Sequence, residues 1–267
     1  MRAAYRAARG LRPTLITLLA LGLSGCLMRP RPTRTPPAAA HEARPSAHLG
    51  RPYRVVPARS RLIILVYRAG ALAALGHNHI IACRCVSGTF DVPHDVLATT
   101  FTLSIAVGQF TVDDARLRAA EHSAAFPPDV PQSARRGTRH NMLSAAVLDA
   151  QAFPDIEIRS AGLQRAPART GSEVRARVQI GLRGQTHLIT LPVHYRLSGD
   201  ELAARGVFSL EQTSLGLKPF SVLLGALRVK NQLTVRFDLV AVPASAARAV
   251  ASPVRPRSSA AARRPPR

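Results

Sequence analysis

The chain has 267 residues and a formal net charge of +22, and it contains three cysteines and no tryptophan. Most of the charge lies at the ends, because residues 1–52 hold nine arginines and one glutamate, residues 244–267 hold six arginines and no acid, and the stretch between them carries only +8. No basic stripe is interleaved with aromatic residues, so we do not expect nucleic acid as a partner.

The N-terminus has the features of a bacterial export signal. A positively charged start precedes an apolar run from Thr14 to Leu23, which is too short to span a bilayer as a mature helix. The run ends in the tetrapeptide LSGC, which resembles a lipobox whose cysteine, Cys26, is acylated. An ordinary cleaved signal with an incidental Cys26 is the alternative. We expect a signal peptide over residues 1–25 and a periplasmic, membrane-anchored lipoprotein, in the outer rather than the inner membrane because Leu27 follows the cysteine.

Both flanks of the central region are rich in Arg, Pro and Ala and hold few large apolar residues. Such segments cannot form a core. We therefore expect an extended linker over residues 26–52, one folded domain over residues 53–243, and a disordered basic tail over residues 244–267. The domain is long enough to bury a core or to enclose an internal cavity.

The domain shows repeated alternation of apolar and polar residues, which is typical of strands with one buried face. The clearest cases are residues 101–107, 174–182 and 227–239. Further strands are expected over residues 61–67, 80–92, 155–160, 189–195 and 202–211. About eight strands joined by short turns predict an all-β fold, a closed antiparallel up-and-down barrel.

One long interruption separates the strands, between Gly108 and Pro154. Residues 113–124 and 138–150 each have helix-forming composition and a plausible N-cap, with three prolines between them. The acidic pair at 113 and 114 is best explained as the start of the first helix. We predict a two-helix insertion over one barrel mouth, with Met142, Val147 and Phe153 turned inward.

The segment from Gly76 to Cys85 holds four candidate soft-metal ligands, His77, His79, Cys83 and Cys85. In one extended strand the first and last of them would stand about 26 Å apart, so a single ion could contact at most a pair. Three interpretations stay open. The histidines line the entrance of a strand, one of them hydrogen-bonds a ligand headgroup, or a pair contributes to a metal or redox site.

We expect Cys83 and Cys85 to be two core-facing thiols, because a disulfide across one intervening residue of an extended strand is strained. No Gly-x-Ser-x-Gly elbow, His-Glu-x-x-His pair or phosphate loop occurs in the sequence. The sequence therefore predicts neither an enzyme nor a metal site.

Several short motifs, in order, resemble the YceI-like family of lipid- or polyisoprenoid-binding bacterial periplasmic proteins. They are Tyr53-Arg54-Val55, Ser60-Arg61-Leu62, Gly88-Thr89-Phe90, Asp149 with Phe153-Pro154-Asp155-Ile156 and Ser160, Leu182-Arg183-Gly184-Gln185-Thr186, and Ser214-Leu215-Gly216-Leu217. The resemblance implies a lipocalin-like barrel whose interior takes an isoprenoid chain, such as a quinone tail, or another amphipathic lipid. The Gly76-His77-Asn78-His79 stretch, the lipobox and the Arg-rich flanks depart from the common family pattern.

The resulting hypothesis is a non-enzymatic envelope lipoprotein that carries or sequesters an isoprenoid-like lipid. It needs no cofactor besides a bound isoprenoid or quinone-like lipid, its partners are that lipid and the membrane, and a homodimer is compatible with the sequence. A metal- or redox-active protein centred on His77, His79, Cys83 and Cys85 is one alternative, and a barrel packed full as a structural module is another. The expected ligand-binding residues are Ile63, Leu65, His77, His79, Phe90, Phe101, Leu103, Ile105, Met142 and Phe153.

Overall fold

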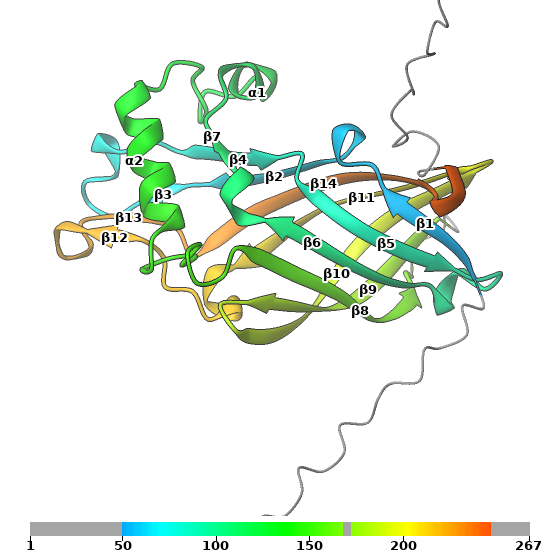
Figure 1. The fold of residues 1–267 in the computed structure, drawn as a ribbon. Coiled ribbons are helices and arrows are strands. Elements are labelled where there is room, and N and C mark those ends of the chain that lie inside the picture. Colours follow the sequence, from blue (N-terminus) through cyan, green and yellow to red (C-terminus); the bar gives the residue numbers. More distant parts are fainter. Residues whose placement is uncertain (1–49, 168–171, 247–267) are drawn as a thin grey trace, which may run out of the picture. The chain divides into compact units, whose positions relative to one another are not determined.

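The computed structural model describes residues 50–167 and 172–246, which are mostly β-structure (Figure 1). The expected signal peptide, the acylation site Cys26, the linker up to residue 49 and the tail from residue 247 lie outside the described residues. Within the described part of the chain, no helix has both the length and the apolar character needed to cross a membrane.

Eight strands close into an antiparallel barrel, in which each strand pairs with the next and the last pairs with the first (Figure 1). In barrel order the strands are β1 (Arg51–Val55), β5 (Val86–Val92), β6 (Thr100–Ala106), β8 (Asp155–Arg165), β9 (Glu173–Leu182), β10 (Gln185–Ser198), β11 (Glu201–Glu211) and β14 (Gln232–Pro243). The expected eight-stranded barrel is confirmed. Its first strand begins at Arg51, two residues before the expected domain boundary.

Near one end of the barrel, three strands are interrupted and continue as separate short strands. These are β2 (Arg61–Val66), β4 (His79–Cys83) and β7 (Thr111–Val112), which pair in that order, with β2 also bound to β14. At the break between β1 and β2, the buried Ser60 side chain accepts a hydrogen bond from the N–H of Val240 at 3.0 Å. The barrel wall is thereby extended beyond the closed ring.

A small second sheet lies at this same end. It consists of β12 (Ser221–Val222), β13 (Leu227–Val229) and β3 (Arg68–Ala69), in that order (Figure 1). The predicted final strand over residues 227–239 is thus divided at Lys230. There the main chain turns, and the Gln212 side chain donates a hydrogen bond to the Lys230 carbonyl at 2.8 Å.

The predicted two-helix insertion is present between β7 and β8. Helix α1 spans Ala115–Ala120 and α2 spans Gln132–Leu143. The first helix is shorter than expected, and the second begins six residues earlier, directly after Pro131, and ends where Ser144 becomes extended. Helix α2 packs against β7 and covers the interrupted end of the barrel (Figure 1).

The barrel interior follows the alternation visible in the sequence. In β9 the side chains of Val174, Ala176 and Val178 are buried, whereas those of Arg175 and Arg177 between them are exposed. A separate, smaller apolar cluster lies on the outer face of β2 and β4, around Leu65, Ile80 and Phe126. The buried side chains inside the barrel stabilise the barrel itself, and the outer cluster attaches the two-helix insertion to it.

Candidate functional site

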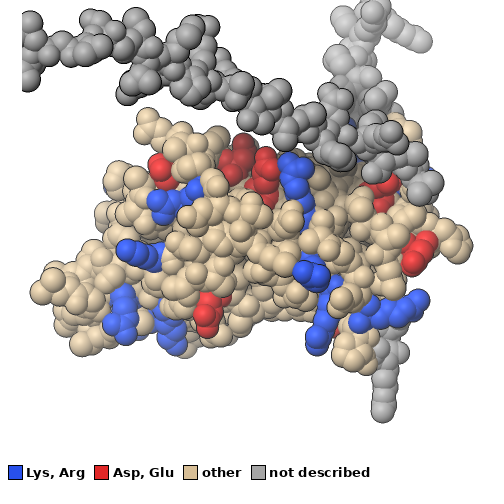
Figure 2. All heavy atoms as spheres, turned by 90° about the horizontal axis from the view of Figure 1, so that it is seen from below, with Lys and Arg blue, Asp and Glu red and all other residues tan. Residues whose placement is uncertain are grey.

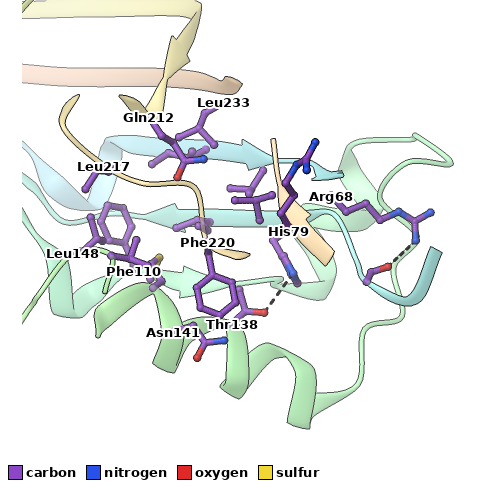
Figure 3. Close-up of a pocket in the computed structure, with 18 of the residues that line it drawn as sticks. Arg68, His79, Phe110, Thr138, Asn141, Leu148, Gln212, Leu217, Phe220 and Leu233 are labelled. Atoms are coloured by element: carbon purple, nitrogen blue, oxygen red, sulfur yellow. Dashed lines mark hydrogen bonds between the residues drawn. The ribbon is translucent and has the colours of Figure 1, made fainter. Parts of the chain in front are cut away.

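A cavity of about 470 Å³ lies at the end of the barrel that α2 covers (Figure 3). Its lining is mainly aliphatic and aromatic, with side chains from β2, β4, α2 and β14 and from the loop that follows β11. The few polar side chains that line it include His77, His79, Thr138, Asn141 and Gln212. The volume is in the range of about 300–1,000 Å³ that small-molecule sites usually have.

Strand register decides which residues of β2 and β4 line this cavity. Ile64 pairs with Ile81 and Val66 pairs with His79, and all four side chains line the cavity. Because side chains alternate between the two faces of a strand, the intervening residues point to the outer face.

Ile63 and Leu65, which the sequence suggested as ligand contacts, therefore lie on the wrong face of β2. Leu65 belongs to the outer cluster with Ile80, and Ile63 packs against that cluster. Residues 62–66 are apolar throughout, because both faces of β2 are covered, one by the cavity lining and one by the insertion. Residues 62–66 therefore lack the alternation of apolar and polar residues that shows, in other strands, which face is buried.

The other proposed contacts are divided between the two ends of the barrel. His77, His79 and Met142 line the cavity, as does Val147. Phe90 and Phe101 instead border a separate void of about 50 Å³, with their ring centroids 5.3 Å apart. The remaining three lie outside the cavity lining: Leu103 and Ile105 are in the packed core, and Phe153 covers Gly184 at the β9–β10 turn.

A buried polar network lies behind one wall of the cavity, which it reaches through His79. The Nδ1 atom of His79 lies 2.7 Å from Oδ2 of Asp113, and Oδ1 of Asp113 accepts hydrogen bonds from Arg118 at 2.5 Å and from the Ile80 N–H at 2.9 Å. The side chains of Asp113 and Arg118 have no exposed surface, and that of His79 is 13% exposed. The ring of His79 points toward Thr138 on α2, whose hydroxyl lies 3.4 Å from Nε2 (Figure 3).

The partners of Asp113 determine the ionisation state of its carboxyl. Burial by itself would raise the pKa of the carboxyl, but the hydrogen bonds from His79 and Ile80 and the charges of His79 and Arg118 outweigh it and lower the pKa. Since a carboxylate only accepts hydrogen bonds, the Nδ1 atom of His79 carries a proton. In a neutral ring Nε2 is then an acceptor that faces the cavity.

The neighbouring residues of the Gly76-His77-Asn78-His79 stretch hold this wall in place. The Asn78 side chain accepts a hydrogen bond from the Arg68 N–H at 2.9 Å and donates one to the Ala125 carbonyl at 2.8 Å. Its own carbonyl accepts from Arg118 at 2.8 Å. Asn78 thus joins β3, the strand that begins at His79, and the insertion, while His77 adds a second imidazole 6.3 Å from the ring of His79.

Cys83 and Cys85 form a disulfide, which corrects the expectation of two free thiols. The expected strand over residues 80–92 is interrupted at Arg84, where the chain bends and brings the two Cα atoms to 5.3 Å. Disulfide sulfurs are not available as thiolate ligands. Among the described residues, no three His, Cys, Asp or Glu side chains are grouped closely enough to hold a metal ion. The metal alternative therefore has no support there.

The sequence pattern does not predict several of the cavity residues, notably Phe110, Leu148, Leu217 and Phe220 (Figure 3). They come from turns and loops, where no periodic pattern assigns a facing. The acidic pair predicts a helix start that involves both Asp113 and Asp114, but only Asp114 caps α1, with its carboxylate accepting from the N–H of Arg116. Asp113 has a positive φ of 54° and points to His79 instead.

Comparison with known proteins supports this architecture. A model of the YceI-like domain matches residues 53–241. Among solved structures, BcnA of Burkholderia cenocepacia is 13% identical, with a TM-score of 0.50, and the alignment covers 70% of this chain and 98% of BcnA. At this identity the likeness concerns the fold alone.

Two further solved structures are more distant. A polyisoprenoid-binding domain from Saccharophagus degradans, implicated in plant cell wall breakdown, is 11% identical over 72% of this chain and 98% of its own, with a TM-score of 0.46. The YceI protein of Campylobacter jejuni is 7% identical over 59% of this chain and 80% of its own, with a TM-score of 0.38. No curated protein matches the chain in sequence.

Proposed function

The chain belongs to the YceI-like domain family, and from this premise we propose that it is a non-enzymatic carrier that holds an isoprenoid-like lipid in the cavity under α2. The observation that carries the proposal is the combination of a roughly 470 Å³ apolar cavity with one polar wall. An amphipathic lipid has the matching division into a long apolar chain and a small polar headgroup.

Burial of the chain would supply the binding free energy. At about 25 cal/mol per Å² of apolar surface, covering a few hundred Å² outweighs the loss of freedom of a flexible ligand. A barrel packed to normal core density would have no room for this. Away from α2 the barrel interior holds buried side chains such as Leu103 and Val178 and a void of only about 50 Å³ beside Phe90, so we place the ligand at the end near α2.

The polar wall would bind the headgroup. The carboxylate of Asp113 pairs with Arg118, and its contact with His79 holds a proton on the Nδ1 atom of that ring. In a neutral ring the single lone pair of Nε2 is an acceptor, which the Thr138 hydroxyl approaches to 3.4 Å and which a ligand hydroxyl would take over. We infer a headgroup that donates a hydrogen bond, such as the hydroxyl of an isoprenoid alcohol, a phenol or a quinol.

Native mass spectrometry of the protein purified without detergent from a bacterial envelope fraction tests the proposal. We expect one apolar lipid per chain, identified by organic extraction. In an Ala134→Trp variant, a large side chain on α2 would fill the cavity, so lipid occupancy should fall.

Ser133→Trp is the matched control, because Ser133 is exposed on the same helix and does not line the cavity. The chain has no native tryptophan, so the fluorescence of each variant reports whether its indole is buried. Protein that is empty after mild purification and takes up no added isoprenoid alcohol would refute the carrier function.

We also propose that acylation of Cys26 anchors the protein to the periplasmic face of the outer membrane. The lipobox-like LSGC sequence supports this proposal. Each buried methylene of an attached acyl chain contributes about 0.8 kcal/mol to membrane binding. A Cys26→Ser variant is expected to move from the membrane fraction to the soluble periplasmic fraction, and unchanged fractionation would contradict acylation.

A further inference from the structure

Two loops at the mouth of the cavity expose large apolar side chains to solvent. One follows β3 and carries Leu72 and Leu75, and the other connects β12 to β13 and carries Leu223 and Leu224. Leu75 is 71% exposed, Leu223 is 62% exposed and Leu224 is fully exposed. The loops are bound to each other through the N–H of Leu72 and the carbonyl of Ala226, at 2.8 Å. We call these four leucines the lip.

The backbone of the lip is unfavourable for the residues it contains. Leu223 and Leu224 have φ angles of 53° and 55°, a left-handed conformation that is costly for a residue with a Cβ atom. Both side chains are exposed to water in this conformation. Neither feature benefits the folded barrel, which points to a role in contact with another surface.

The segments around the mouth are basic and contain no acidic residue. Residues 66–78, 130–148 and 212–231 contain no Asp or Glu. They hold six exposed cations, which are Arg68, Arg136, Arg139, Lys218, Arg228 and Lys230. None of the six takes part in the ion pairs of the described residues. Figure 2 shows several blue side chains, with a few red ones nearby, toward the end of the molecule that carries β12 and β13, and further blue ones at the opposite end.

The lip is continuous with the cavity. Arg68, Gly76, Val222 and Leu227, at the bases of the two loops, line the cavity directly. A surface bound by the leucines would thus lie against the cavity mouth.

We propose that the lip docks on an anionic phospholipid bilayer and inserts its leucines among the acyl chains. The six cations contact the lipid phosphates, each contributing to binding in a salt-dependent way. The cavity mouth then opens onto the membrane, so that a lipid passes between bilayer and barrel without crossing water. This contact is separate from any acyl anchor on Cys26.

Vesicle flotation tests this surface, with the whole chain carrying Cys26→Ser so that acylation cannot contribute. We expect binding to vesicles of phosphatidylcholine mixed with phosphatidylglycerol, weaker binding to pure phosphatidylcholine, and release by salt. Leu223→Asn/Leu224→Asn should lower the affinity for the anionic vesicles about tenfold or more, because two leucines that the bilayer would bury are lost. Asn tolerates the left-handed conformation, so the hairpin is expected to fold.

The barrel wall offers matched controls. Leu188 and Val207 are 53% and 60% exposed there, and Leu188→Asn/Val207→Asn should leave vesicle binding unchanged. Likewise, Lys218→Glu/Lys230→Glu should reduce binding to the anionic vesicles, whereas Arg175→Glu/Arg177→Glu on β9 should reduce it much less.

Three results would overturn the proposal. They are no binding of the parent protein to anionic vesicles, equal losses in the lip and wall variants, or a concentration-dependent dimer that only the lip variants abolish. Lipid occupancy, measured by native mass spectrometry on the same variants, reports on the cavity independently of the lip.

Discussion

At the polar wall of the cavity, one carboxylate connects three parts of the chain. Asp113 binds the side chain of His79 and the N–H of Ile80 at β4, and it pairs with Arg118 on α1. Arg118 in turn donates to the carbonyls of Asn78 and Pro127. Since the charges of this pair are fully buried, each is stable only in the presence of the other.

Replacing Asp113 with Asn is therefore expected to destabilise the fold by about 3–5 kcal/mol, because Arg118 would stay buried without a counter-charge. Asp114→Asn is the control, since Asn caps a helix as well as Asp does and should change little. Urea unfolding of both variants measures the difference.

The same variant should change the acid dependence of stability. The folded pKa of Asp113 is lowered, so its ionisation contributes stability above the unfolded pKa and that contribution is lost as the pH falls through the folded pKa. The difference in unfolding free energy between the parent protein and Asp113→Asn should consequently become smaller in acid. A gap that stays constant down to the acid range would contradict an ionised Asp113.

His79 should determine the preference for the headgroup. If Nε2 accepts a hydrogen bond, the parent protein should bind farnesol about three- to tenfold more tightly than farnesyl methyl ether, which has no hydroxyl to donate. His79→Phe should bind both with similar affinity. Competition binding measures the ratio, and equal affinities in the parent protein would show that His79 does not act as the acceptor.

Sequence reasoning could identify only part of this wall. The spacing of His77 and His79 marked them as candidates for contact with a headgroup, and both line the cavity. The role of Asp113 was not visible, because its neighbour Asp114 is an ordinary helix cap and the two are adjacent in sequence. The left-handed φ of Asp113, which turns its side chain away from α1, is a tertiary feature.

At the scale of elements, the hairpin from β12 to β13 combines exposed leucines with a strained turn. Leu224→Gly should raise the free energy of unfolding by about 0.5–1 kcal/mol, because glycine adopts a positive φ without the Cβ clash, which exceeds its entropic cost. Leu72 in the neighbouring loop has a φ of −99°, so Leu72→Gly should destabilise instead. Thermal unfolding of the two glycine variants measures these changes in stability. An equal loss of stability in both variants would argue against strain at Leu224.

The alternation of apolar and polar residues predicts which side chains point to the interior where one side of a strand is exposed, as in β9. It fails where both sides of the strand are covered. In β2 the inner face lines the cavity and the outer face packs under Phe126, so every residue from Leu62 to Val66 is apolar. The breaks at Arg84 and Lys230 were also unpredicted. Neither segment contains a Gly or Pro at its break, and only the disulfide and the hydrogen bond from Gln212 reveal the two breaks.

For the whole molecule, the closed barrel and the position of the insertion followed from strand count and turn spacing, which depend on local pattern. The location of the cavity did not, because it depends on which half of the barrel the side chains fill. Phe90 and Phe101 pack at one end, and the interrupted strands at the other end leave space under α2. Such differences in packing arise from tertiary contacts that no segment contains by itself.

A cavity of this size should make global stability depend on its ligand. A lipid that binds only the folded barrel stabilises it by about 2.7 kcal/mol at a free concentration of one hundred times Kd. For a domain of this length, that gain corresponds to a rise in Tm of about 5–10 °C. Delipidated protein should thus melt lower than protein as purified, and added farnesol should restore the Tm.

Ala134→Trp and Ser133→Trp separate occupancy of the cavity from lipid bound elsewhere. With the cavity filled, the Ala134→Trp protein should melt at the same temperature with and without farnesol, whereas Ser133→Trp should respond like the parent. If both variants respond equally, the stabilising lipid binds outside the cavity, because the two positions differ only in whether their side chains enter it. Loss of the response in Ala134→Trp alone would assign the stabilisation to a ligand beneath α2.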